Sequence, residues 1–213
     1  MPTRPTHPTR DCTDAPVGLT AERINLLSIA PQPWKNGAGV TREIAVEAGR
    51  SGGFDWRISL ANVDRDAPFS AFPGIDRCIV LLRGAGMRLK ASDGTLDHRL
   101  HTLLEPFHFS GDVALQATLL DGACIDFNVM VRRGLFTADV RCHRSEAEVA
   151  ASAAMLMLCC VGEWQIGDHA SPALQPMQAM LSRRPVRPMR VRPTGGGSAA
   201  RLLHVRLCHD ATP

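Results

Sequence analysis

Two segments of the chain, 54–61 and 123–131, alternate strictly between apolar and polar residues. This is the pattern of a β-strand that is buried on one face, because successive side chains of a strand point to opposite sides. The polar sides of the two segments carry Asp55, Arg57, Ser59, Asp126, Asn128 and Met130. We therefore expect two amphipathic strands, each with a polar stripe that faces either solvent or the inside of a small barrel.

Short apolar runs separated by Gly, Pro or Asp predict many further strands. The expected ranges are 26–30, 40–46, 78–83, 86–90, 96–100, 113–120, 135–142, 155–161, 164–167 and 202–207. Only residues 145–155 have a helix-forming composition, with Ser145 at the start and acidic residues in the first turn; a loop that leads into a strand is the alternative there. About a dozen short strands predict an all-β sandwich or barrel.

The two ends of the chain and one internal segment differ from this pattern. Residues 1–22 are rich in Pro and poor in apolar side chains, and predict a flexible tail. Residues 183–199 combine Pro-Arg repeats with three successive glycines, and predict a mobile loop before a last strand. The expected organisation is therefore a folded body over 23–207 with a C-terminal tail over 208–213.

Charge and cysteine content restrict the class of protein. A formal net charge of +3 over 213 residues is too small to predict a nucleic-acid partner, although seven arginines and no acidic residue lie within 183–206. The most apolar stretch, 150–161, is shorter than the roughly 20 residues of a membrane-spanning helix. Seven cysteines without a CxxC pair are typical of reduced thiols. We expect a cytoplasmic protein that binds neither membranes nor nucleic acids.

Metal and phosphate sites are not predicted. The chain has no P-loop, no GxGxxG and no GxSxG motif. Among eight histidines no HxH pair occurs, and residues three apart, such as His98 and His101, face opposite sides of a strand. We therefore predict no metal and no cofactor. His108 lies near a turn and could line a pocket.

The densest group of chemically versatile residues lies in PQPWKNGAGVTREI, residues 31–44. Its candidate ligand-binding residues are Trp34, Lys35, Asn36, Thr41, Arg42 and Glu43. A tryptophan can form an apolar wall, while Arg and Lys can hold an anionic group. A polar hairpin on the surface is an equally good interpretation of these residues alone.

Five segments together resemble the HutD/Ves family: WKNGAGVTREI, FDWRISLANV, DAPFSAFPGIDRCIVLLRGAGMRL, FHFSGD and IDFNVMVRR. The resemblance covers about residues 24–180 and the strand at 202–207. It implies a cupin-like (RmlC-type) fold with two β-barrel halves in one chain, a bicupin, without the usual cupin metal ligands. It also implies a regulatory or protective role in bacterial histidine utilisation, with small carboxylates as ligands.

We predict that the 34–43 segment and the polar stripe of 54–61 share one pocket. Arg57, Arg77 and Arg132, with Lys35 and Arg42, would compete for the carboxylates. Trp34 and Trp56 would line or support the pocket, to which Ser59, His108 and Asn128 would add polar groups. The ligand would be urocanate or a formylated glutamate.

Two other hypotheses stay open from the sequence. A metal-independent isomerase or hydrolase acting on the same acids would use Glu43 or His108 as general base. A protein-interaction module would use the 183–199 loop. A homodimer is compatible with any of the three.

Overall fold

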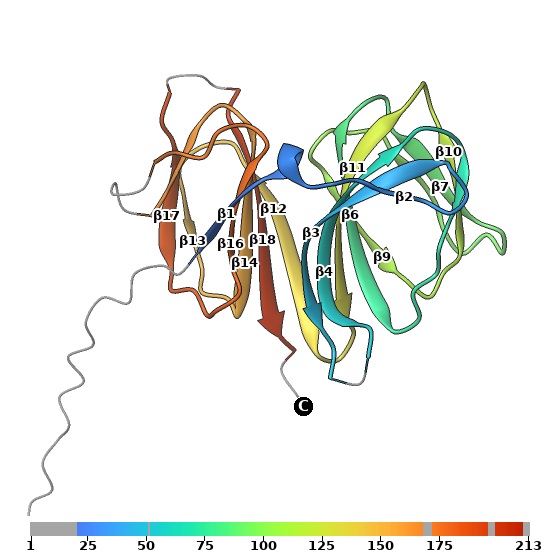
Figure 1. Cartoon of the computed structure of the whole chain (residues 1–213), viewed down its shortest axis with the longest axis horizontal. Coiled ribbons are helices and arrows are strands. Elements are labelled where there is room, and N and C mark those ends of the chain that lie inside the picture. Colours follow the sequence, from blue (N-terminus) through green and yellow to red (C-terminus); the bar gives the residue numbers. More distant parts are fainter. Residues whose placement is uncertain (1–20, 51, 168–171, 196–198, 211–213) are drawn as a thin grey trace, which may run out of the picture.

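The computed structural model of the protein describes residues 21–50, 52–167, 172–195 and 199–210, which form two β-structured halves side by side (Figure 1). The N-terminal half has a six-stranded sheet with the order β2 (Gln32–Pro33), β3 (Gly39–Ala48), β4 (Phe54–Val63), β11 (Cys124–Arg132), β6 (Ile75–Arg83), β9 (Pro106–Ser110). Its second sheet has the order β5 (Ala67–Phe69), β10 (Leu115–Leu119), β7 (Met87–Ala91), β8 (Asp97–Leu100).

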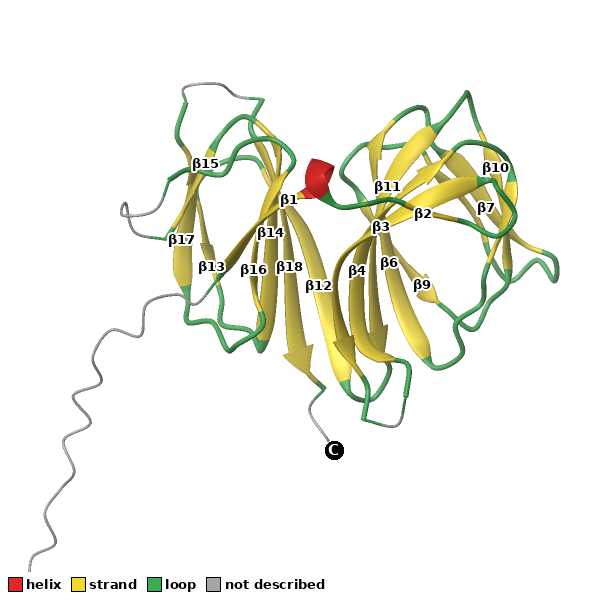
Figure 2. Ribbon diagram, viewed as in Figure 1, coloured by secondary structure: helices red, strands yellow, loops and turns green. Residues whose placement is uncertain are grey.

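The C-terminal half repeats this two-sheet plan. Its five-stranded sheet has the order β1 (Glu22–Asn25), β16 (Gln178–Ser182), β14 (Ala154–Val161), β18 (Arg201–His209), β12 (Phe136–His143). A three-stranded sheet, β13 (Ala147–Val149), β17 (Met189–Pro193), β15 (Trp164–Ile166), covers it. The first strand of the chain thus belongs to the C-terminal half, and the short 3-10 helix η1 (Leu26–Ser28) leads from β1 into the N-terminal half (Figure 2).

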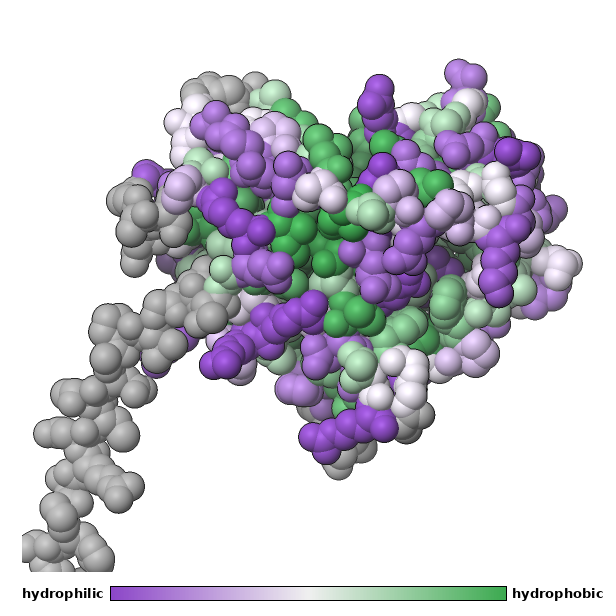
Figure 3. Space-filling model, viewed as in Figure 1, coloured by the Kyte–Doolittle hydropathy of each residue, from purple (hydrophilic) through white to green (hydrophobic). Residues whose placement is uncertain are grey.

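Three apolar cores hold the four sheets together. The largest lies between the six-stranded and five-stranded sheets and is shared by both halves, with Trp56, Phe127 and Leu156 among its buried side chains. A second core fills the N-terminal half around Leu89, and a third fills the C-terminal half around Trp164. Apolar side chains also gather at the junction of the halves on the face seen in Figure 3. The six-stranded sheet is therefore covered on both sides, and one of its faces looks into the N-terminal half.

The alternating patterns are confirmed as strands β4 and β11, which pair with each other in the six-stranded sheet. Their apolar sides, including Ile58 and Val129, contribute to the core shared by the halves. Their polar stripes face the inside of the N-terminal half, where the stripe of β4 lies beside Thr41 and Glu43 of β3. The fold is all-β, as predicted, and each half is a sandwich of two sheets rather than a closed barrel.

Two predicted elements differ from the structure. The segment 26–30 is not a strand, because the Asn25 side chain accepts a hydrogen bond from the Leu27 amide and starts η1. The segment 145–155 is not a helix; it contains β13 and the start of β14, whose buried side chains pack in the C-terminal cores. Packing overrides the helix-forming composition there.

The predicted domain boundaries are modified at three places. Most of the predicted N-terminal tail lies outside the described residues, and β1 begins at Glu22. The predicted loop 183–199 is wrong for residues 189–193, which form β17 between β13 and β15; residues 196–198 lie outside the described part. The predicted C-terminal tail begins too early, because β18 continues to His209; residues 211–213 are not described.

The described residues contain no helix that is long and apolar enough to cross a membrane. Six cysteines lie in the described part of the chain, and all six are free thiols.

Candidate functional site

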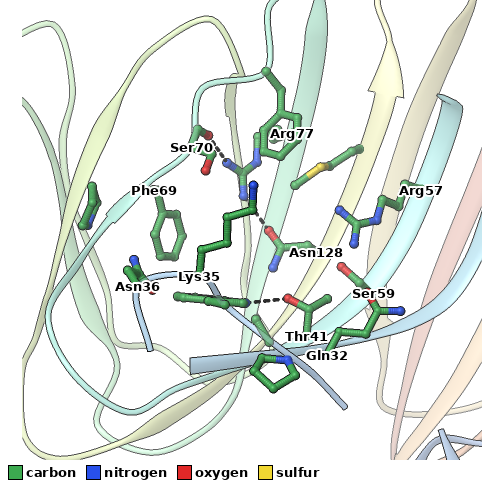
Figure 4. Close-up of a pocket in the computed structure, with 16 residues that line it drawn as sticks. Gln32, Lys35, Asn36, Thr41, Arg57, Ser59, Phe69, Ser70, Arg77 and Asn128 are labelled. Atoms are coloured by element: carbon green, nitrogen blue, oxygen red, sulfur yellow. Dashed lines mark hydrogen bonds between the residues drawn. The ribbon is translucent and has the colours of Figure 1, made fainter. Parts of the chain in front are cut away.

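A cavity of about 430 Å³ opens between the six-stranded sheet and the β5 segment of the N-terminal half (Figure 4). Its polar lining comes from β3, β4, β6 and β11 and from the turn before β3. Eight predicted site residues line it: Trp34, Lys35, Asn36, Thr41, Arg57, Ser59, Arg77 and Asn128. The structure thus brings the 34–43 segment and the polar stripe of β4 to one cavity.

The turn between β2 and β3 positions Trp34, Lys35 and Asn36. The Gly37 amide donates to the Trp34 carbonyl at 3.0 Å, and Gly37 has a φ of 65°, a left-handed conformation that glycine adopts without strain. The Asn36 side chain accepts from the Ala38 amide at 3.0 Å, which fixes the turn. Trp34 Nε1 donates to Thr41 Oγ1 at 2.7 Å. This bond holds the indole ring against the cavity.

Arg57 lines the cavity from the polar stripe of β4. Its Nε lies 2.8 Å from Glu43 Oε2, and both side chains are partly exposed. Glu43 does not itself line the cavity. The carboxylate therefore compensates the Arg57 charge from outside the lining, while the rest of the guanidinium remains next to the cavity.

Arg77 is the most deeply buried cation of the cavity, with 6% of the residue exposed. Its guanidinium lies 5.0–5.7 Å from the ring centres of Phe69, Phe72 and Phe109. Its Nη2 donates to Asn128 Oδ1 at 2.9 Å, and its Nη1 donates weakly to the Ser70 carbonyl at 3.4 Å. Aromatic faces and neutral oxygens stabilise this charge only in part.

Arg77 has no ion pair within the described residues, and its Nε has no hydrogen-bond partner there. Burial lowers the pKa of Arg77 to about 10, with Arg57 adding to the decrease, whereas Asp126 opposes it. The side chain is still charged at neutral pH. A buried guanidinium without an ion pair at the wall of a cavity is suited to bind an anion.

Lys35 adds a third positive charge. Its side chain extends across the cavity toward Arg77 and Asn128 (Figure 4). Among the described residues that line the cavity, none is acidic. The lining therefore combines three cations, several neutral hydrogen-bonding groups and the aromatic side chains of Trp34, Phe69 and Phe72.

Three predicted site residues lie on the wrong face or in the wrong place for this cavity. Trp56 is 2% exposed in the core shared by the halves, because it alternates with Arg57 along β4. Arg42 likewise alternates with Thr41 and donates to Asn62 Oδ1 at 3.1 Å. His108 on β9 is exposed and lines a separate groove beside β12.

Arg132, although it follows the same stripe as Asn128, also lies outside the cavity lining. Its Nε contacts Asp55 at 3.2 Å, and its Nη2 donates to the carbonyls of Gly52 and Phe54 at 3.0 and 2.9 Å. These bonds anchor the turn between β3 and β4. We therefore assign Arg132 a structural role.

Sequence reasoning missed several residues of the cavity. The missed lining residues are Gln32, Pro33, Ala61, Pro68, Phe69, Ser70, Phe72 and Met130. Asp126, fully buried behind Asn128, was also missed as a site residue. The available signals were the polar stripe of 123–131 and the segment APFSAFPG, whose phenylalanines surround Arg77.

The chemistry of the cavity does not fit a metal ion. Across the described ranges, no group of three or more His, Cys, Asp or Glu side chains is arranged to bind one. The cations that line this cavity would also repel a divalent ion.

Comparisons with known proteins agree on family and fold. The family model described as HutD matches residues 28–198. Protein Ves from Citrobacter koseri is 37% identical over 145 residues, which are 67% of this chain and 74% of that protein. The structure of HutD from Pseudomonas fluorescens SBW25 has a TM-score of 0.77 at 24% identity and covers 90% of this chain and 100% of that one.

A cupin 2 conserved barrel domain protein from Leptotrichia buccalis has a TM-score of 0.53 at 8% identity, over 89% of this chain and 96% of that one. At this identity the likeness concerns the fold alone. The two-sheet halves are thus cupin-like, and the chain contains two of them.

Proposed function

The chain belongs to the HutD family, and on that premise we propose that it is a metal-free cupin that binds a small anionic ligand in the cavity of its N-terminal half. One observation carries the proposal. Arg77 is buried at the cavity wall without a carboxylate partner among the described residues, and its Nε has no hydrogen-bond partner there. A ligand carboxylate at the cavity wall would supply the missing negative charge.

The ligand we propose is an intermediate of histidine degradation, either urocanate or a formylated glutamate. The aromatic side chains of Trp34 and Phe69 would pack against the planar ring of urocanate while Arg77 holds its carboxylate. A formylated glutamate would instead place two carboxylates against Arg77 and Lys35. A cavity of about 430 Å³ is in the range of small-molecule sites.

The role we propose is regulatory or buffering rather than catalytic. The alternative, a metal-independent isomerase or hydrolase, needs a general base at the ligand. Glu43 is engaged by Arg57 and lies outside the lining, and His108 lies in another groove. Incubation of the ligand with the protein should leave the ligand chemically unchanged, and catalytic conversion would favour the enzyme.

Calorimetric titration of the purified protein with urocanate and with formylglutamate tests the binding. We expect one of them to bind and to raise the melting temperature. At a ligand concentration of 100 times Kd the added stability is about 2.7 kcal/mol. Arg77→Met should keep most of the bulk of the side chain and lose the binding.

Arg132→Met is the matched control, because Arg132 is an arginine of the same half that is paired outside the cavity. The control should bind like the wild type at a temperature at which circular dichroism shows both variants folded. Absence of binding by every carboxylate tested, or unchanged binding by Arg77→Met, would contradict the proposal.

A further inference from the structure

A carboxyl group lies buried behind the cavity. Asp126 on β11 is 0% exposed and shares its strand face with Asn128 and Met130, inside the N-terminal half. Its Oδ1 accepts a hydrogen bond from Asn128 Nδ2, and its Oδ2 has no partner among the described residues. A buried carboxylate with one hydrogen bond and no ion pair is poorly stabilised in its charged form.

Asn128 connects this carboxyl group to the cavity. Its amide nitrogen donates to Asp126, so its amide oxygen faces Arg77 and accepts from Nη2 at 2.9 Å. Because an asparagine amide can be turned either way, the acceptor at Asp126 selects the orientation that suits Arg77. The carboxyl group and the guanidinium thus interact through one side chain rather than directly.

The charged groups that face Asp126 come from few elements. Arg77 on β6 is the main cation, and Arg57 on β4 is paired with Glu43 on β3. Cys124 precedes Asp126 on the same face of β11, and its own pKa is raised by burial and by Asp126. The opposing four-stranded sheet contributes apolar side chains, among them Leu89, Leu115 and Ala117.

Burial raises the pKa of Asp126 to about 7, although Arg77 and the Asn128 hydrogen bond both oppose the rise. The Arg77 charge is thus one of the two influences that favour the ionised form. A ligand carboxylate that binds Arg77 would cancel much of this positive field and add a negative charge nearby.

We propose that Asp126 is the positioning residue of the cavity, and that it takes up one proton from solvent when a carboxylate binds to Arg77. Only an O–H bond forms on Asp126; no other bond changes. The inference rests on the proposed function, since it needs a carboxylate in the cavity. Beyond the proposed function, it predicts that ligand binding in the cavity depends on pH, because proton uptake makes binding tighter at lower pH.

Calorimetric titration with the acid that binds, formylglutamate or urocanate, at pH 8 in Tris and in triethanolamine measures this proton. Neither buffer is an anion, and their ionisation enthalpies differ, so the difference in binding heat reports the protons exchanged. The ligand carboxylates titrate well below this range and do not contribute. We expect uptake of up to about one proton per ligand, and a Kd that falls up to about tenfold per pH unit between pH 8.5 and 7.5.

Asp126→Asn is the matched variant, because its amide oxygen can still accept from Asn128. It should bind the same acid without proton uptake and with a Kd independent of pH, which a merely structural role of Asp126 would not produce. Should this variant not fold, the difference infrared spectrum of the wild type should gain a protonated-carboxyl C=O band on binding.

The outcomes separate the two proposals. If neither formylglutamate nor urocanate binds to the folded wild type, the proposed function fails. If either acid binds with the same heat in both buffers and without a new carboxyl band, only the proton uptake is refuted. If Asp126→Asn still takes up a proton, the assignment to Asp126 is wrong.

Discussion

Asp126→Asn should change how the stability of the ligand-free protein depends on pH. The carboxyl group is fully buried, and its pKa is raised from 3.8 to about 7. Between these values the folded state keeps a proton that the unfolded state releases. As the pH rises between these two values, the free energy of unfolding of the wild type therefore falls relative to that of the variant. The fall is up to about 1.4 kcal/mol per pH unit and about 4 kcal/mol in total.

The sign follows from the direction of the shift. The contribution of Asp126 to the free energy of unfolding is largest below pH 4, because its folded-state pKa is the higher one. This contribution is lost as the pH rises to 7, and above pH 7 it no longer changes with pH. His204 changes stability in the opposite direction over part of this range, because burial lowers its pKa to about 3. The difference between wild type and variant removes that contribution, which both proteins share.

Urea unfolding followed by tryptophan fluorescence between pH 4.5 and 8 measures the difference. Asp112→Asn is the control, because the Gly74 amide, Ser110 and Arg133 lower the pKa of this surface carboxylate to about 2. Its difference curve should be flat over the same range. Parallel curves for wild type and Asp126→Asn would refute the assignment of a protonated carboxyl group to the interior.

Three further perturbations test the packing and charge of the same fold by urea unfolding. Gly39→Ala would place a Cβ 2.2 Å from the Asn62 carbonyl oxygen. It should therefore destabilise the protein by about 1–3 kcal/mol through the β3–β4 pairing. Unchanged stability would show that the two strands move apart enough to accept the methyl group without cost. Arg57→Met should destabilise by up to about 1 kcal/mol, since its pair with Glu43 is partly exposed, and a double-mutant cycle with Glu43→Gln should return a similar coupling. His204→Gln should retain more stability as the pH falls from 6.5 toward 4, because the buried neutral imidazole binds a proton only when the protein unfolds; equal acid sensitivity would contradict this.

The sequence predicted the central strands because their burial is one-sided. Alternation in 54–61 identified β4 and also separated Arg57 from Trp56, which stand on opposite faces. The expectation that both line one pocket conflicted with that same alternation. The cavity has Trp34 as its tryptophan wall instead, because a turn rather than a strand presents that residue.

Other features depend on contacts that local patterns do not encode. Strand β17 has the composition of a loop and becomes a strand by pairing with β13 and β15 on its two sides. Asp126 belongs to a polar stripe, yet its complete burial depends on the four-stranded sheet that covers the stripe. Arg77 follows Asp76 and directly precedes the apolar run 78–82, and only the folding of 67–72 beside β6 places two phenylalanines against it.

The placement of β1 has a consequence for the order of events during synthesis. Residues 22–25 leave the ribosome before their partner in the sheet, β16, which follows about 155 residues later. This strand therefore stays without its partner while about 155 further residues are made, and a contact over such a separation forms slowly. A nascent chain that ends before β16 would contain the N-terminal half and an unpaired strand β1. A chaperone or a second chain could bind this strand.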